Sequence, residues 1–357
     1  MGLAELVGKV QTVLGIIDPD QLGITLTHEH FLIDMSVMFE EPAECTRKVL
    51  AHQPVSFSNI GWIHYHPWDN LDNIVLMDEE VAISEGLRFK RAGGSSVVDV
   101  TNIGGGRDPL ALARISRATG LNIIMGAGYY VDGARPKGVD FSEEKLTEEI
   151  VRDITVGVGN TGIRAGILGE IGNSWPLLDR DKTILRAVSR AQKKTGVAVL
   201  IHPGRSPSSP FEIIETLDKA GADINRVVMS HLESRIFDHN TRINLAKTGC
   251  YLNYDTFSWE GWFPRRMVLS EANPIKTDLP NDAERINQIM VLIKEGFLNQ
   301  ILISHDHCMK HRLWHYGGSG YSHILDNVVP LMREKGVLEE YIHTLLVENP
   351  RRLLQFV

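Results

Sequence analysis

Six side chains in this sequence that could bind a metal ion stand at or next to the ends of short apolar runs. They are His28, His30, Glu170, His202, His231 and Asp306. Imidazole and carboxylate ligands together suit Zn²⁺ or another first-row divalent ion, whereas histidine ligands disfavour Ca²⁺. A catalytic zinc ion normally needs three protein ligands and a water, so this larger set favours two divalent metal ions bridged by a carboxylate.

The apolar runs indicate the elements that must position these residues. We predict strands at Ile24–Thr27, Ser96–Thr101, Asn122–Ala127, Ala165–Glu170, Val197–His202, Arg226–His231, Cys250–Tyr254 and Ile301–His305. Apolar residues spaced three and four apart predict helices between them, for example Asp181–Thr195 and Asn281–Glu295. Strands that alternate with helices pair in parallel, because a parallel crossover needs a helix to return the chain. We therefore expect an α/β fold, a (β/α)₈ TIM barrel formed by residues 1–357 as a single domain, with an open doubly wound sheet as the alternative.

The barrel fold would explain why the metal-binding residue types occur at strand ends. The C-terminal ends of parallel barrel strands meet on one face, where barrel enzymes place their catalytic groups. His28 and His30 are two residues apart, so they point the same way from a strand and can bind one ion together. Considered alone, His202 or His231 would be better explained as a hydrogen-bonded histidine of the core. The joint placement of the six residues is what predicts a metal centre.

Three segments do not follow the strand and helix repeat. Lys9–Leu26 predicts an N-terminal β-hairpin with its turn at Asp18–Asp20, which would close the N-terminal end of the barrel. Asp34–Leu76 is expected to form a long loop after the first strand, and Asp255–Pro280 is a second irregular stretch. Both are rich in aromatic residues, and long aromatic loops are typical of lids or interfaces. A homodimer is compatible with such loops.

Three further histidines need an interpretation. His64 and His66 repeat the spacing of two, but they do not stand at a strand end, so we interpret them as lid or loop-packing residues rather than an accessory metal site. His305 is adjacent to Asp306 and should point to the opposite side of its strand. We expect it to support the site rather than to bind metal.

Charge and composition narrow the function classes. The chain has 37 Lys+Arg and 45 Asp+Glu residues, a net charge of −8, which gives no support to a nucleic-acid or anionic-membrane surface. No apolar stretch approaches the ~20 residues that span a bilayer, and the N-terminus does not resemble a secretory signal. The cysteines are odd in number and scattered, at Cys45, Cys250 and Cys308. They favour a reducing compartment. We expect a cytoplasmic protein that acts on a small molecule.

The ligand motifs resemble those of the amidohydrolase superfamily and, within it, the phosphotriesterase family. The similar segments are Gly23–His30 (GITLTHEH), Ile201–Gly204 (IHPG), Ser230–His231, Ile303–Asp306 (ISHD) and Glu348–Leu354 (ENPRRLL). The resemblance implies that His28, His30 and Asp306 bind a more buried metal ion. It likewise implies that His202 and His231 bind a more exposed one. Zn²⁺ is the first candidate for both.

The sequence departs from the usual family pattern after the fourth strand. Phosphotriesterases and their lactonase relatives bridge the two ions with a carboxylated lysine there, but Gly166–Gly172 contains Glu170 and no lysine. With a bridging glutamate, this sequence resembles the phosphotriesterase-related proteins. That resemblance implies hydrolysis of a small N-acyl amide of the N-acetyltaurine or N-acyl amino acid type. The alternatives are a lactonase with promiscuous phosphotriesterase activity and a metal protein without turnover whose aromatic loops bind a partner.

Roles for individual residues follow from this chemistry. A shared water between two ions would be deprotonated near neutral pH, with Glu170 as the bridge and Asp306 as the group that accepts its proton and delivers it to the leaving amine. Arg205, three residues after His202, is a candidate clamp for a sulfonate or carboxylate, or else a surface arginine. Tyr129 and Tyr130 follow the third strand. They could bind the oxyanion or pack under a loop.

Overall fold

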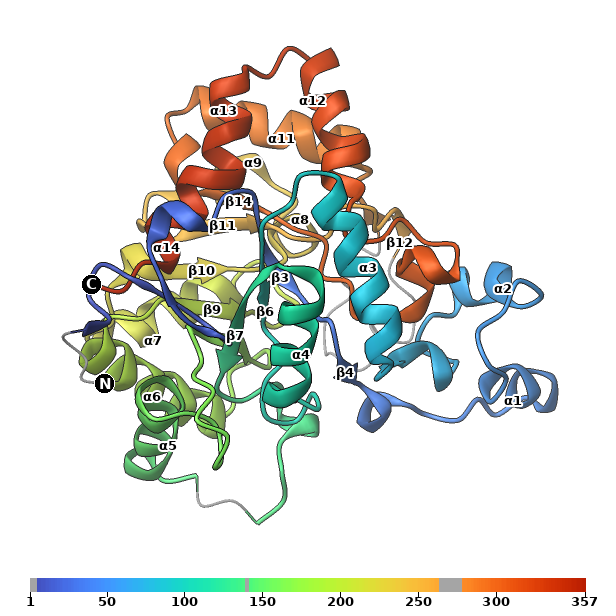
Figure 1. The fold of residues 1–357 in the computed structure, drawn as a ribbon, viewed down its shortest axis with the longest axis horizontal. Coiled ribbons are helices and arrows are strands. Elements are labelled where there is room, and N and C mark those ends of the chain that lie inside the picture. Colours follow the sequence, from blue (N-terminus) through green and yellow to red (C-terminus); the bar gives the residue numbers. More distant parts are fainter. Residues whose placement is uncertain (1–4, 139–140, 263–277) are drawn as a thin grey trace.

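The computed structural model describes residues 5–138, 141–262 and 278–357. Its central element is a sheet of eight parallel strands in the order β14-β11-β10-β9-β8-β7-β6-β3 (Figure 1). The strands are β3 (Thr25–Glu29), β6 (Ser96–Asp99), β7 (Asn122–Ala127), β8 (Ile167–Gly172), β9 (Val199–His202), β10 (Val227–Met229), β11 (Tyr251–Tyr254) and β14 (Ile301–Ile303). All eight predicted strands are confirmed.

The sheet closes between β3 and β14 through hydrogen bonds that lie outside the regular strand ladder. The backbone N–H of Asp306 donates to the carbonyl of His28 over 3.1 Å. The backbone N–H of His28 donates to Oγ of Ser304 over 3.0 Å, and this hydroxyl donates to the His28 carbonyl over 2.9 Å. Closure makes the fold a (β/α)₈ barrel and excludes the open doubly wound alternative.

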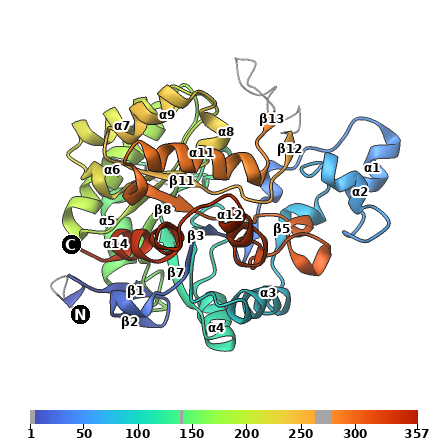
Figure 2. The ribbon, with the colours of Figure 1, turned by 90° about the horizontal axis from the view of Figure 1, so that it is seen from above.

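Helices alternate with the strands and surround the barrel (Figures 1 and 2). They are α3 (Glu79–Arg91), α4 (Pro109–Thr119), α5 (Glu143–Thr155), α6 (Asp179–Thr195), α7 (Ser209–Lys219), α8 (Leu232–Arg235), α9 (His239–Ala246), α11 (Asp282–Lys294), α12 (Val329–Glu334), α13 (Glu339–His343) and α14 (Asn349–Leu354). Local signals define their ends. The carboxylate of Asp108 caps α4 by accepting from two backbone N–H groups, and Gly120 ends that helix with a φ of 67°. The two helices predicted from periodicity correspond to α6 and α11.

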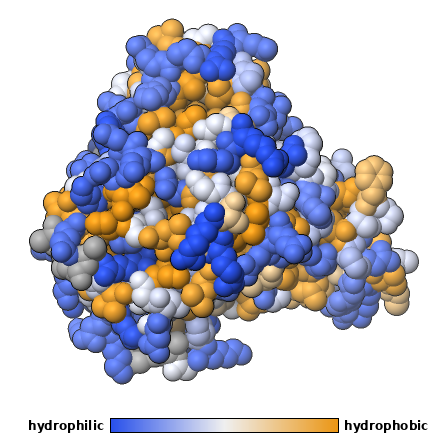
Figure 3. Space-filling view, viewed as in Figure 1, coloured by the Kyte–Doolittle hydropathy of each residue, from blue (hydrophilic) through white to orange (hydrophobic). Residues whose placement is uncertain are grey.

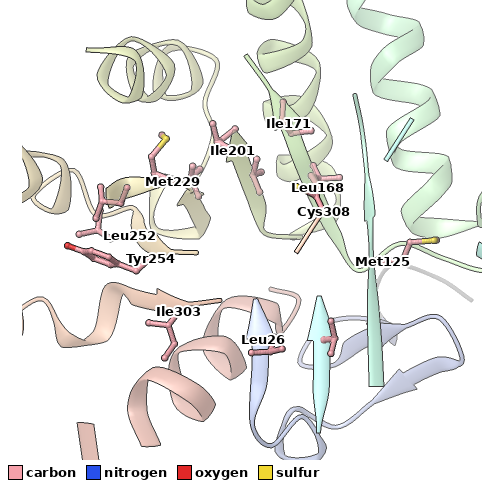
Figure 4. Close-up of a cluster of buried hydrophobic side chains, with 14 of the residues drawn as sticks. Leu26, Met125, Leu168, Ile171, Ile201, Met229, Leu252, Tyr254, Ile303 and Cys308 are labelled. Atoms are coloured by element: carbon pink, nitrogen blue, oxygen red, sulfur yellow. The ribbon is translucent and has the colours of Figure 1, made fainter. Parts of the chain in front are cut away.

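Neighbouring residues of a strand belong to two different apolar clusters. Ile201 and Met229 pack with helix residues such as Ile184 in the layer between strands and helices, and Figure 4 shows side chains of this layer on successive strands. Leu200 and Val228 belong to a smaller cluster inside the barrel. Since side chains alternate along a strand, each strand contributes to both clusters.

The N-terminal hairpin closes the N-terminal end of the barrel, but its turn lies elsewhere than predicted. Strands β1 (Val10–Thr12) and β2 (Gly15–Ile17) pair antiparallel, so the turn comes before Asp18–Asp20. Oγ1 of Thr12 holds the turn by donating to the Gly15 carbonyl over 2.8 Å and accepting from the Leu14 N–H. Val10 packs with the apolar cluster inside the barrel, as expected for a plug.

The predicted long loop after the first strand is a folded insertion. It begins at β4 (Ile33–Asp34), contains α1 (Cys45–Ala51) and α2 (Ile60–Tyr65), and returns through β5 (Val75–Leu76), which pairs antiparallel with β4. Both views show α1 and α2 projecting away from the barrel (Figures 1 and 2). Val49 and Phe57 are exposed there, and Figure 3 shows apolar residues on this part of the surface.

The second irregular segment is only partly described, and Phe263 lies outside the described residues. Short strands β12 (Gly261–Trp262) and β13 (Asp278–Leu279) pair antiparallel at its two ends. Phe257 and Trp259 are buried in the core rather than exposed. Within the described part of the chain, every helix falls short of the length and apolar character needed to cross a lipid bilayer.

Candidate metal centre and active-site cavity

The six predicted ligands lie together at the C-terminal end of the barrel. They are His28, His30, Glu170, His202, His231 and Asp306. Nε2 of His30 lies 3.2 Å from Oδ1 of Asp306, and Nε2 of His28 lies 3.6 Å from the same oxygen. These three residues offer ligand atoms that all lie within 4.8 Å of one another. This group could therefore hold a metal ion.

Glu170 lies between this group and the remaining histidines. Its Oε1 is 3.5 Å from Nε2 of His28 and 2.9 Å from Nε2 of His231. The same oxygen is 2.7 Å from Nδ1 of His202. His28, Glu170 and His231 form a second group of ligand atoms within 4.8 Å. The carboxylate thus contacts residues expected to bind each ion, as a bridging ligand must.

The polar groups at this centre fit a bound cation. Nε2 of His28 is buried and has no hydrogen-bond partner among the described residues. Burial disfavours a charge on this histidine, but three nearby carboxylates outweigh burial and raise the pKa of His28 to about 10. The carboxylates belong to Glu170, Asp255 and Asp306. A divalent ion would bind the buried Nε2 of His28 and would offset the negative charge of the nearby carboxylates.

Asp255 is a functional residue that the sequence analysis did not identify. It follows β11, and its Oδ2 accepts a hydrogen bond from Nδ1 of His28 over 2.7 Å. Its Oδ1 accepts from the backbone N–H and from Nδ1 of His231, over 2.8 and 2.9 Å. A carboxylate behind a histidine fixes the ring so that Nε2 faces the metal. The available signal was an acid at a strand end, the same signal that identified the ligands.

Two of the candidate ligands occupy strained backbone positions. His231 and Asp306 have φ values of 57° and 52°, in the left-handed region that costs a non-glycine residue roughly 1–2 kcal/mol. The hydrogen bond from the His231 N–H to Asp255 stabilises the first. Buried Glu29 holds the segment around the second by accepting from the N–H groups of His305 and His307. Such strain is typical of functional sites.

His305 does not join the ligand cluster. Its Nδ1 donates to Oε1 of Glu29 over 2.7 Å, on the other side of the segment from Asp306. This contact agrees with the expected supporting role. His66 stacks on Trp62 at 4.9 Å, and His64 lies edge-on to His311 at 5.4 Å. These contacts agree with loop packing.

A cavity of about 490 Å³ opens over the centre. His30, His202, His231 and Asp306 line it, together with Tyr130 and two arginines. Arg205 is the predicted clamp. Arg235 was not predicted, although it lies four residues after His231 much as Arg205 lies three after His202. Arg235 is buried, and its guanidinium donates to the carbonyl of Pro203 over 3.2 Å and to Oγ of Ser234 over 2.9 Å.

The two predicted tyrosines point in opposite directions. Tyr130 lines the cavity, with its ring edge-on to His202 at 5.3 Å. Tyr129 is buried against Phe141, and its hydroxyl donates to the carboxylate of Glu149 on α5. The expectation that Tyr129 contacts the substrate is therefore not supported, because adjacent residues of extended backbone face opposite sides.

Comparison with known proteins extends the likeness beyond these motifs. A model described as the Phosphotriesterase family matches residues 8–354. The N-acetyltaurine hydrolase of Xenopus tropicalis is 43% identical over 359 residues, which cover 99% of this chain and 100% of that protein. A Resiniferatoxin-binding protein from Rhodobacter sphaeroides has 33% identity and a TM-score of 0.91, covering 98% of this chain and 95% of that one. The lactonase Lmo2620 from Listeria monocytogenes has 25% identity and a TM-score of 0.76, covering 98% and 99%.

Proposed function

This chain belongs to the phosphotriesterase family, and we propose that it is a metal-dependent hydrolase that cleaves a small N-acyl amide. N-acetyltaurine is the first candidate substrate and an N-acyl amino acid is the second. The convergence of six candidate ligand residues, four of which line one cavity together with two arginines, carries this proposal. The relatives named N-acetyltaurine hydrolase, which align with nearly the whole chain, support it.

The proposed cofactor is a pair of divalent ions, with Zn²⁺ first. His28, His30 and Asp306 would hold one ion, His202 and His231 the other, and Glu170 would contact both. When bound, such a pair supplies Lewis acidity for the substrate carbonyl and lowers the pKa of a bound water towards neutrality. The glutamate provides the bridging carboxylate directly, so no carbon dioxide is required to assemble the site.

The two oxygens of Asp306 permit separate tasks. Oδ1 faces His28 and His30, while Oδ2 lies 3.9 Å from Nδ1 of His231. We assign Oδ2 the proton transfer: it accepts a proton from the attacking water and donates it to the amide nitrogen as the carbon–nitrogen bond breaks. The products are a carboxylic acid and an amine. Tyr130 lines the cavity, and we assign its hydroxyl the hydrogen bond to the oxyanion.

The two arginines suit a substrate whose amine portion carries an acidic group. Arg205 and Arg235 belong to segments after neighbouring strands, Arg235 as the last residue of α8, and the guanidinium of Arg235 is held by the Pro203 carbonyl. Because Pro203 precedes Arg205 by two residues, this bond also ties the two segments together. A planar guanidinium is suited to bidentate binding of a sulfonate or carboxylate. We propose that the arginines bind the acidic group of the amine portion.

Two other interpretations predict different measurements. The apolar part of the cavity would also accept a lactone, which favours the lactonase alternative with promiscuous phosphotriesterase activity. A protein of this fold that is named for binding a ligand supports the second interpretation, a role without turnover.

The three free cysteines support a cytoplasmic location, and the exposed apolar residues of the insertion are compatible with a homodimer.

The deciding experiment compares kcat/KM of the zinc-loaded protein for three substrate classes. N-acetyltaurine, its neutral analogue N-acetylethanolamine and a simple lactone serve as the panel, with a phosphotriester added. We expect N-acetyltaurine to exceed the neutral analogue by at least about tenfold, since the arginines bind only the anion. Arg205→Gln should reduce this ratio, whereas exposed Arg114→Gln, distant in sequence and paired with Glu79, should not. A lactone preference, or turnover of none, would refute amide hydrolysis.

A further inference from the structure

The cavity is larger than N-acetyltaurine needs. Its volume of about 490 Å³ lies in the range of clefts that enclose drug-sized ligands, roughly 300–1,000 Å³. The acyl group of N-acetyltaurine has one methyl carbon beyond its carbonyl, so this substrate would fill only part of the space. The remaining space invites a larger group, and its lining indicates the chemistry of that group.

Strand order separates the ends of the cavity. Since the barrel closes between β14 and β3, β9 lies opposite β3 in the order β3-β6-β7-β8-β9-β10-β11-β14. Arg205 and Arg235 follow β9 and β10, whereas Met35 and Met38 come from the insertion directly after β3. The arginines and the methionines therefore enter the cavity from separate parts of the strand order, with β6, β7 and β8 between β3 and β9.

The side formed by the insertion is apolar. Four of its residues line the cavity and are named here the acyl wall: Ile33, Met35, Met38 and Trp68. Ile33 belongs to β4 and pairs with Leu76 of β5, which anchors the wall to the base of the insertion. Met38 is 39% exposed at the cavity edge. Unbranched thioether side chains adapt to flexible apolar ligands.

We propose that the acyl wall binds an acyl chain longer than acetyl. The preferred substrates are then unbranched N-acyl conjugates of taurine or an amino acid, with the acidic group at the arginines and the acyl chain along the wall. This inference rests on the proposed amide hydrolysis and adds the acyl specificity. The reaction is unchanged: water adds to the carbonyl, the carbon–nitrogen bond breaks, and a fatty acid and a free amine leave.

The expected size of the effect follows from apolar burial. Each methylene buried against the wall should raise kcat/KM about fourfold until the wall is filled. The gain should appear as a lower KM with little change in kcat, because a longer chain adds contacts remote from the reacting carbonyl.

The test compares N-acetyl, N-butanoyl, N-hexanoyl and N-octanoyl taurine on the zinc-loaded protein. Met38→Gln keeps the size of the side chain but removes its apolar character. Val37→Gln is the matched control, because Val37 lies on the same short helix (Ser36–Met38), is 54% exposed and is not among the cavity-lining residues of the described chain. Binding of each conjugate to the Asp306→Asn protein is measured in parallel by calorimetry.

We expect kcat/KM to rise with chain length in the wild type and in Val37→Gln, and to rise less steeply in Met38→Gln. Hydrolysis of the acetyl conjugate in preference to all longer ones would overturn the inference and leave the proposed function intact. Equal slopes in the two variants would overturn the assignment of the wall. If no conjugate turned over, the proposed function would fail. Separately, a calorimetric affinity that did not increase with chain length would overturn the acyl wall.

Discussion

Replacing Asp255 with asparagine should loosen two of the proposed metal ligands at once. The carboxylate accepts from Nδ1 of His28 through Oδ2, and from the backbone N–H and Nδ1 of His231 through Oδ1. Asparagine has the same shape but only one acceptor oxygen. Whichever way the amide is oriented, its NH₂ group faces an N–H donor, so one histidine loses the acceptor that fixes its ring.

The magnitude follows from the hydrogen bonds that are lost. A hydrogen bond to a charged group contributes about 1.5–3 kcal/mol. Loss of one such bond, without a compensating partner, corresponds to roughly a 10- to 100-fold weaker binding of metal. The Asp255→Asn protein should therefore bind zinc about 10- to 100-fold less tightly, and its activity should recover as zinc is added in excess.

Competition between the protein and a chromogenic chelator measures this zinc affinity. Asp153→Asn is a matched control, because Asp153 is also buried but pairs with Arg107 over 2.8 Å, away from the metal-binding residues. That control should lower Tm without a change in zinc affinity. An Asp255→Asn protein that bound zinc within about twofold of wild type would refute the positioning role of this carboxylate.

Three further outcomes are expected. Asp306→Asn should lower kcat at least about 100-fold at saturating zinc, because an amide cannot carry the proton to the leaving amine; near-normal turnover would contradict this. Tyr130→Phe should lower kcat/KM about 10-fold, while Tyr129→Phe should leave it within about twofold and lower Tm through the lost bond to Glu149; equal kinetic effects would reverse the assignment. Removal of metal with a chelator should abolish hydrolysis and lower Tm, with zinc restoring both; full activity after chelation would argue against the metal centre.

The ligand set was predictable because it depends on regular structure. Short buried strands leave a strong apolar pattern, and their C-terminal ends meet wherever a parallel barrel closes. Each predicted strand lies within two residues of its observed bounds. Alternation also predicted different directions for His305 and Asp306, although both residues lie beyond β14 and Asp306 has a left-handed backbone.

Contacts made by irregular backbone were less accessible. The Asp18–Asp20 segment has the stronger turn composition, yet the hairpin turns earlier because the Thr12 hydroxyl satisfies its backbone. Arg235 reaches the cavity from α8, a helix that begins at the left-handed residue His231. Asp255 stands at a strand end like the proposed ligands, but only the folded chain shows that it contacts two histidines. Side-chain hydrogen bonds between distant segments have no periodic signature.

The position of each residue in the barrel separates chemistry from specificity. The proposed metal-binding residues come from strand ends, where buried neighbours such as Glu29 and Asp255 fix their directions. The arginines and the proposed acyl wall come from segments after different strands. A change of length or polarity in the insertion alters the space for an acyl chain but leaves intact the hydrogen bonds that orient the histidines. Acyl preference can therefore diverge between relatives that share the same ligands.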